Sequence, residues 1–212
     1  MLASRLALVA HEPERFPVPW QERVLSATIR VPNGSVEITT THVPPGSSNG
    51  WIKIEHLEDS VSGSRPLSSN PKLLCGDFNT PRRELPTAEG ITLGQTEDGR
   101  FNRTLGGRWD AAKRDILLGL ADLGMPDVFR ALYGYQPQPA SWILERGDAR
   151  FPRRFDHVFA YPSLGPTAFT YVHELRESAV SDHSPALVEF AERVSAPRSS
   201  AGDKLRSCPA ST

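Results

Sequence analysis

Short segments rich in apolar and β-branched residues recur along the chain between clusters of turn residues, and this pattern predicts β-strands. The two longest are residues 24–31 (VLSATIRV) and 35–43 (SVEITTTHV), which are separated by Pro32-Asn33-Gly34. An Asn-Gly pair between two such segments predicts a hairpin. The other expected strands are residues 6–10, 72–75, 141–144, 155–161, 168–172 and 186–190.

Apolar residues at helical spacing mark three further segments. In the first of them, four apolar residues recur at intervals of three or four: Trp51, Ile54, Leu57 and Val61. The same spacing predicts helices over 108–123 and 127–133, and a long loop over 80–106 precedes them. Because strands and helices do not alternate regularly, we expect an α+β fold. Its form would be two packed mixed β-sheets flanked by helices, a four-layer α/β/β/α sandwich.

The composition is that of an ordinary globular chain. Of its 212 residues, 38% are hydrophobic and 23% charged, and the net charge of −1 excludes a strong basic field that would attract nucleic acid. No apolar stretch approaches the roughly 20 residues that span a membrane, so we expect no membrane partner. We expect one domain over residues 1–192 and a disordered, Ser/Pro/Ala-rich tail over 193–212.

The two cysteines favour a reducing compartment. Cys75 lies in an apolar strand and Cys208 in the polar tail, so a disulfide between them is not expected. We therefore expect a cytoplasmic location.

Polar pairs stand at the ends of several predicted strands. They are Thr41-His42, Asp77 with Asn79, Asp156-His157 and Asp182-His183. Side chains at strand ends are held on a rigid backbone, and this set of aspartates, histidines and an asparagine suits metal-assisted hydrolysis of a phosphate ester. Each pair alone is more often a turn or a surface feature. His56, between Glu55 and Glu58 on a predicted helix, is expected to be solvated.

The ordered combination of motifs is more specific. His-x-Pro-Pro-Gly at 42–46 is followed by GDFN at 76–79, Arg-x-Asp-His-Val-Phe at 154–159 and SDHSP at 181–185. This series resembles the endonuclease/exonuclease/phosphatase family, the fold of DNase I and exonuclease III, over roughly residues 2–190. The resemblance implies a metal-dependent phosphoester hydrolase, a nuclease or a phosphatase, in which water attacks phosphorus in line. The substrate would be a phosphoester, with nucleic acid as one option.

The resemblance also implies roles for single residues. Asp77 matches the aspartate that orients the attacking water, and Asn79 matches its partner, which can donate to a developing oxyanion. His183 matches the histidine that contacts the scissile phosphate, and Asp156 matches the aspartate that keeps this imidazole charged.

Two further roles follow from the same resemblance. His42 matches the second histidine of DNase-type members, and Asp182 matches a metal ligand. Hard oxygen ligands favour Mg²⁺ or Mn²⁺ as the cofactor.

The beginning of the chain departs from the family pattern. Family members open with a strand that carries an asparagine, followed by Leu-Gln-Glu, whose glutamate binds the metal, and no such segment precedes Ser4-Arg5. We therefore expect a fold that lacks this first strand and this glutamate. The alternative function is then a catalytically impaired relative with at most a binding role. A full-length form is expected to be a monomer.

Residues 146–154 (RGDARFPRR) are strongly basic, with four arginines opposed only by Asp148. On a loop beside the site these arginines would contact a nucleic-acid backbone. A solvated basic loop explains the same pattern equally well, and the sequence leaves both interpretations open.

Overall fold

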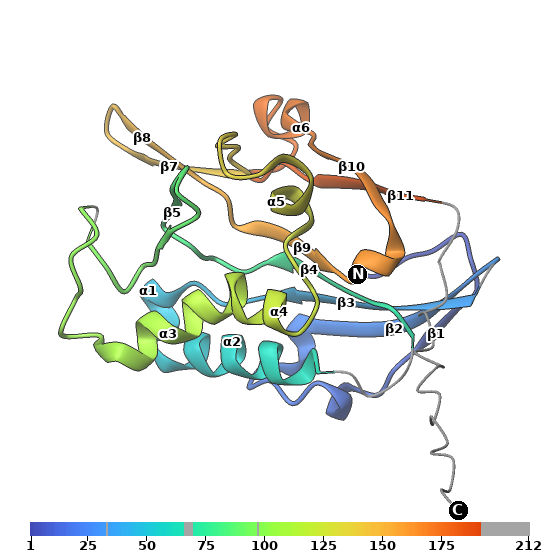
Figure 1. Cartoon of the computed structure of the whole chain (residues 1–212). Helices are drawn as coiled ribbons and strands as arrows, with labels where there is room; N and C mark the ends of the chain where they lie inside the picture. Colours follow the sequence, from blue (N-terminus) through green and yellow to red (C-terminus); the bar gives the residue numbers. More distant parts are fainter. Residues whose placement is uncertain (33, 66–69, 97, 192–212) are drawn as a thin grey trace, which may run out of the picture.

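A mixed sheet of five strands forms the centre of the molecule (Figure 1). The computed structural model describes residues 1–32, 34–65, 70–96 and 98–191. The sheet order is β1 (Leu8–Ala10), β2 (Val24–Val31), β3 (Gly34–His42), β4 (Lys72–Asp77) and β9 (Asp156–Ala160). Strands β3 and β4 are parallel, and the other neighbours are antiparallel. The predicted hairpin of β2 and β3 is confirmed, although its turn residue Asn33 lies outside the described residues.

Helices cover one face of this sheet (Figure 1). They are α2 (Trp51–Gly63), which follows the short α1 (Gly46–Asn49), then α3 (Gly106–Leu117) and α4 (Gly119–Asp122). The predicted helix over 108–123 is therefore interrupted at Leu118, next to a glycine that weakens a helix interior. The apolar core of this layer joins Ile54 and Ile116 of the helices to Leu74 and Phe159 of the sheet.

A second apolar core lies on the opposite face of the sheet. The antiparallel pair β10 (Pro166–Tyr171) and β11 (Ala186–Phe190) covers this face, and α5 (Val128–Tyr133) packs against β9 and β10. Phe129 and Phe169 meet Leu73 and Val158 there. Since Leu73 and Leu74 belong to opposite cores, β4 is buried on both faces. The predicted α+β fold of packed mixed sheets with helices is confirmed.

The remaining elements lie in the connections. They are hairpin β5 (Arg83–Glu84) with β6 (Gly90–Ile91), hairpin β7 (Trp142–Arg146) with β8 (Ala149–Arg153), helix α6 (His173–Glu177), and 3-10 turns at Pro13–Arg15, Gln21–Arg23 and Pro162–Leu164. The basic segment 146–154 was expected to be a loop, but it is mostly strand, because Gly147 adopts a φ of 56° in a two-residue hairpin turn.

Two further expectations concern the C-terminal tail and the membrane. The proposed tail 193–212, with Cys208, lies outside the described residues. Of the helices that are described, none has the length and apolar character needed to cross a membrane.

Candidate active site

The register of three neighbouring strands places three of the predicted site residues together at the strand ends, on one side of the sheet. His42 is the register partner of Asp77 in the parallel pair β3–β4. Asp77 is in turn the register partner of Asp156 in the antiparallel pair β4–β9. Three strands from distant parts of the sequence therefore present these side chains next to one another.

Asp156 binds the histidine of the SDHSP motif. His183, on the loop between α6 and β11, contacts Asp156 through its Nδ1, 2.7 Å from Oδ2. This hydrogen bond raises the pKa of His183 above its usual value, against the opposing effect of partial burial. The imidazole is thus more readily protonated near neutral pH than a free histidine is.

Asn79 fixes the orientation of Asp77. The backbone N–H of Asn79 donates to Asp77 Oδ1 at 2.8 Å, and its side-chain Nδ2 donates to Asp77 Oδ2 at 3.0 Å and to the Val43 carbonyl at 2.9 Å. The side-chain amide of Asn79 is therefore engaged within the protein, by Asp77 on one side and Val43 on the other, and the backbone N–H gives Asp77 a second fixed contact. Burial and the nearby Asp156 carboxylate raise the pKa of Asp77 to about 6.

His42 and Asp182 occupy more exposed positions. The Nε2 of His42 lies 3.7 Å from Asp77 Oδ2, and an N–H of Arg23 donates to the His42 ring at 3.3 Å. Desolvation and Arg23 lower the pKa of His42. Asp182 lines a separate hollow of about 490 Å³ with Trp142 and residues of β7, β8 and α6, although its charge still contributes to the raised pKa of His183.

A buried cluster of ion pairs lies next to the two strands that carry Asp77 and Asp156. Arg154 binds Glu84 at 2.6 Å and Asp127 at 2.9 Å, and Arg130 also binds Glu84. His157 connects Asp127 to the Thr80 carbonyl, beside Asn79. Against the effect of burial, the two arginines lower the pKa of Glu84 to about 2. Arg154 and His157 belong to the Arg-x-Asp-His-Val-Phe motif, but nothing in the sequence paired them with Glu84 or Asp127.

Comparison with known proteins identifies the fold. No protein-family model matches the sequence, and no curated protein sequence matches it. Among solved structures, the endonuclease domain of TRAS1, a telomere-specific non-LTR retrotransposon, matches with 16% identity and a TM-score of 0.53 over 87% of this chain and 68% of that one. The AP endonuclease LMAP from Leishmania major matches with 15% identity and a TM-score of 0.53 over 77% of this chain and 53% of that one. The chain has the endonuclease/exonuclease/phosphatase fold. It spans about half the length of the Leishmania enzyme.

The sequence did not single out Lys53 as part of the site. This lysine of α2 is fully buried, and its Nζ donates to the backbone carbonyl of Asn79. Burial lowers the pKa of Lys53 to about 7, and the negative charge of Asp77 opposes that change. A signal existed, because Lys53 lies one turn before Leu57 and therefore shares its sheet-facing side.

The expectation for His56 was wrong. The side chain is fully buried, and its Nε2 lies 2.8 Å from the Thr41 hydroxyl. It shares the inner face of α2 with Lys53 and Ser60, whereas the neighbouring glutamates Glu55 and Glu58 are only partly buried. Desolvation lowers the pKa of His56 to about 4, so the imidazole is neutral.

The carboxylate oxygens at the site suit a hard cation whose remaining coordination positions would be filled by water and substrate. Across the described part of the chain, no three His, Cys, Asp or Glu side chains are grouped as a metal site. Asp77 and Asp156 nevertheless place two carboxylates on adjacent strands, and the charge of Asp156 contributes to the raised pKa of Asp77. Mg²⁺ in phosphoryl-transfer sites is commonly held by one or two carboxylates, with water and substrate phosphate completing its coordination.

Proposed function

We propose that the chain is a metal-dependent phosphoester hydrolase, a nuclease or a phosphatase. The observation that carries this proposal is that Asp77 lies opposite Asp156 on adjacent strands while Asp156 binds His183. A carboxylate that can accept a proton and an imidazolium that can offset negative charge are thereby held on one rigid edge. The two matching structures described above are both endonucleases, which also supports the proposal.

In the proposed reaction, Asp77 orients a water molecule and accepts its proton as the water oxygen bonds to phosphorus. The bond from phosphorus to the leaving oxygen breaks, that oxygen takes a proton from solvent water and leaves as an alcohol, and Asp77 returns its proton to solvent. A pKa of about 6 suits a general base that works near neutral pH. Asn79 holds the carboxylate in place through its two contacts with Asp77.

The histidines stabilise the phosphate group. Protonated His183 donates to a non-bridging phosphate oxygen, and Asp156 keeps the ring charged and oriented. His42 supplies a second polar contact from the exposed side of Asp77. When bound, Mg²⁺ or Mn²⁺ would neutralise phosphate charge, and Asp77 and Asp156 are the carboxylates that would hold it, whereas Asp182, the ligand expected from the sequence, lines a separate hollow.

Hydrolysis of bis(p-nitrophenyl) phosphate tests the proposal. We expect turnover with Mg²⁺ or Mn²⁺ and none in EDTA. Asp77→Asn should reduce kcat by about 10²–10⁴-fold and His183→Ala by about 10²–10³-fold, the usual effects of losing a general base or a charge-stabilising donor.

Two variants away from the site serve as controls. Asp98→Asn changes an exposed loop carboxylate, and His11→Gln changes a histidine bonded to Ser26 and Thr28 near β1; both should keep wild-type turnover. Full activity in EDTA, or unchanged turnover in either site variant, contradicts the mechanism. Binding of a phosphoester without turnover would favour the alternative, an impaired relative with a binding role.

A further inference from the structure

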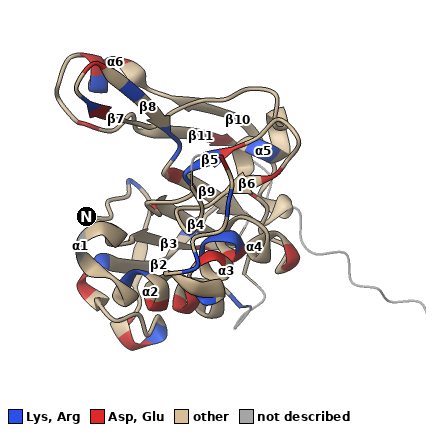
Figure 2. Ribbon diagram, turned by 90° about the vertical axis from the view of Figure 1, so that its left-hand side faces the viewer, with Lys and Arg blue, Asp and Glu red and all other residues tan. Residues whose placement is uncertain are grey.

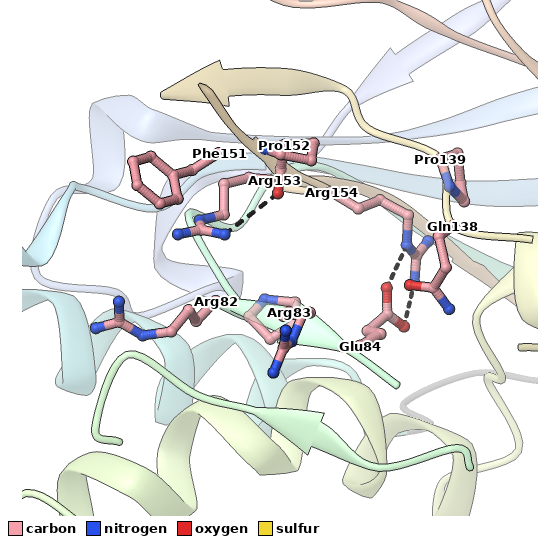
Figure 3. Close-up of a pocket in the computed structure, with 10 residues that line it drawn as sticks. Arg82, Arg83, Glu84, Gln138, Pro139, Phe151, Pro152, Arg153 and Arg154 are labelled. Carbon is pink, nitrogen blue, oxygen red and sulfur yellow. Dashed lines mark hydrogen bonds and ion pairs between the residues drawn. The ribbon is translucent and has the colours of Figure 1, made fainter. Parts of the chain in front are cut away.

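A pocket of about 450 Å³ lies between the segment that follows GDFN and the end of hairpin β7–β8. Figure 3 shows its side chains around an opening, with Phe151 and Arg153 from one segment and Arg82 and Arg83 from the other. The ion pair of Arg154 with Glu84 closes another part of the wall (Figure 3). The volume is within the range of small-ligand sites.

The walls of this pocket continue the two strands that carry the site. The segment containing Arg82 follows Asp77 and Asn79, where β4 ends, and Arg154 and Arg153 lie two and three residues before Asp156, where β9 begins. Because Asp77 and Asp156 are register partners, their continuations leave the sheet side by side. The pocket therefore adjoins the candidate active site.

The wall is rigid and positively charged. Arg153 and Arg154 are 6% and 5% exposed, and Arg153 also lies 5.7 Å from the Phe151 ring centroid. The lining carries four arginines and the carboxylate of Glu84; Arg154 is occupied by Glu84 and Asp127, so the guanidinium groups that a ligand would meet are those of Arg82, Arg83 and Arg153. A guanidinium group can bind a phosphate through two parallel N–H···O hydrogen bonds. The ligand class that matches this lining is therefore a phosphate ester.

We propose that this pocket binds a second phosphate group of the substrate, one that belongs to the same molecule as the phosphate that is cleaved. The proposal rests on the proposed function, because it assigns the substrate two phosphate groups. The second group is the next phosphodiester of a nucleic-acid strand or another phosphate of a small polyphosphorylated molecule. Both offer the same oxygens to the arginines, and the experiment separates them.

Binding without catalysis tests the pocket directly. Fluorescence anisotropy in EDTA would measure the affinity of a labelled single-stranded ten-nucleotide DNA, with inositol hexakisphosphate and inorganic phosphate as competitors. The double variant Arg82→Gln/Arg83→Gln should weaken DNA binding about 10–100-fold, as expected for lost charge-assisted hydrogen bonds, and should reduce its salt dependence. Competition by inositol hexakisphosphate with weak DNA binding would identify a small polyphosphate as the source instead.

Matched variants guard against loss of folding. Arg83 is exposed, so Arg83→Gln alone should keep the melting temperature and still weaken binding. Arg30 is an exposed arginine at the far end of β2, and Arg30→Gln should leave affinity unchanged. Equal affinity in the wild type and both pocket variants, or an equal loss in Arg30→Gln, would overturn the proposal.

Turnover separates failure of the pocket from failure of the proposed function. Bis(p-nitrophenyl) phosphate has one phosphate, whereas an oligonucleotide has many. The double variant should lose at least about tenfold more kcat/KM on the oligonucleotide than on the small ester. Equal losses on both refute the second-phosphate site. A wild type that hydrolyses neither refutes the proposed function, while the binding measurement still decides the pocket.

Discussion

Lys53 and Lys113, which belong to the helices that cover the central sheet, are almost fully buried and differ in what they contact. Lys53 donates from Nζ to the carbonyl of Asn79, the residue that orients Asp77. Lys113 of α3 places its Nζ 4.6 Å from the Trp109 ring centroid. Burial lowers the pKa of Lys53 to about 7 and that of Lys113 to about 6. A buried amine is costly for a fold, so the contact of Lys53 with the site loop indicates a positioning role.

Substituting each lysine with methionine separates this role from general stability. We expect Lys53→Met to lower kcat by about 10–100-fold, the usual range for residues that orient a site through another residue. The melting temperature should stay unchanged or rise, because a buried amine is removed. Lys113→Met is the matched control and should keep kcat. Steady-state kinetics and thermal melts measure both. An equal kcat in the two variants would show that Lys53 does not position Asn79.

The junction of β3 and β4 depends on one glycine. Gly76 has a φ of 142°, and a Cβ at this position would lie 1.8 Å from the carbonyl oxygen of Thr41. The two strand backbones therefore approach as closely as they do only because residue 76 has no side chain. This approach sets His42 opposite Asp77. The glycine of GDFN is thus required by the pairing of strands rather than by the chemistry of the site.

Gly76→Ala should destabilise the protein strongly. We expect a loss of about 3 kcal/mol or more in the free energy of unfolding, since the methyl group meets backbone and either strand must move. Gly107→Ala in the first turn of α3 is the control, because a Cβ there meets nothing within 4 Å, and it should be neutral or stabilising by up to about 1 kcal/mol. Urea unfolding measures both. A Gly76→Ala variant as stable as the wild type would mean that the strands tolerate separation.

Over the molecule as a whole, charged residues of both signs lie on the outer helices, while the ionic cluster around Glu84 lies inside. Figure 2 shows Lys, Arg, Asp and Glu interspersed on α2 and α3. The inner cluster of Glu84 with Arg130 and Arg154 links the β5 segment to α5 and to the start of β9, and the Glu84 side chain is 4% exposed. These links hold the segments that flank the candidate site against the second core.

The cluster makes stability depend on pH. Glu84 has a pKa of about 2 in the fold, below its usual 4.5, so its contribution is fully present above about pH 4.5 and is lost as the pH falls towards 2. The difference corresponds to about 3 kcal/mol. We expect Glu84→Gln to lower the free energy of unfolding by about that amount at pH 7 and by progressively less as the pH falls from 4.5 to 3.

Urea unfolding at pH 7, 5 and 3 measures this dependence. Glu89→Gln changes an exposed glutamate five residues away and should stay within about 0.5 kcal/mol of the wild type. A gap between Glu84→Gln and the wild type that stays constant down to pH 3 would show that the Glu84 carboxylate is not the titrating group.

Local pattern was sufficient for much of the fold. Strands β2, β3 and β11 and helices α2 and α5 fall within two or three residues of their expected bounds, because each buries an apolar side whose spacing the sequence displays. The order of motifs likewise indicated which polar residues to examine, and the structure brings His42, Asp77, Asn79, Asp156 and His183 together.

Charged residues inside the fold could not be read in this way. Arg154 binds Glu84, 70 positions away, and Lys53 binds Asn79, 26 positions away, so helical spacing could place Lys53 on the inner side of α2 but no short segment could show which partner either residue meets. From the sequence, the basic segment 146–154 therefore suggested a loop, and His56 a solvated side chain. Apolar spacing fixed which surfaces are buried, because burial needs only a local periodic pattern. Strand register and long-range ion pairing fixed which polar groups meet, because these contacts exist only after the strands have paired.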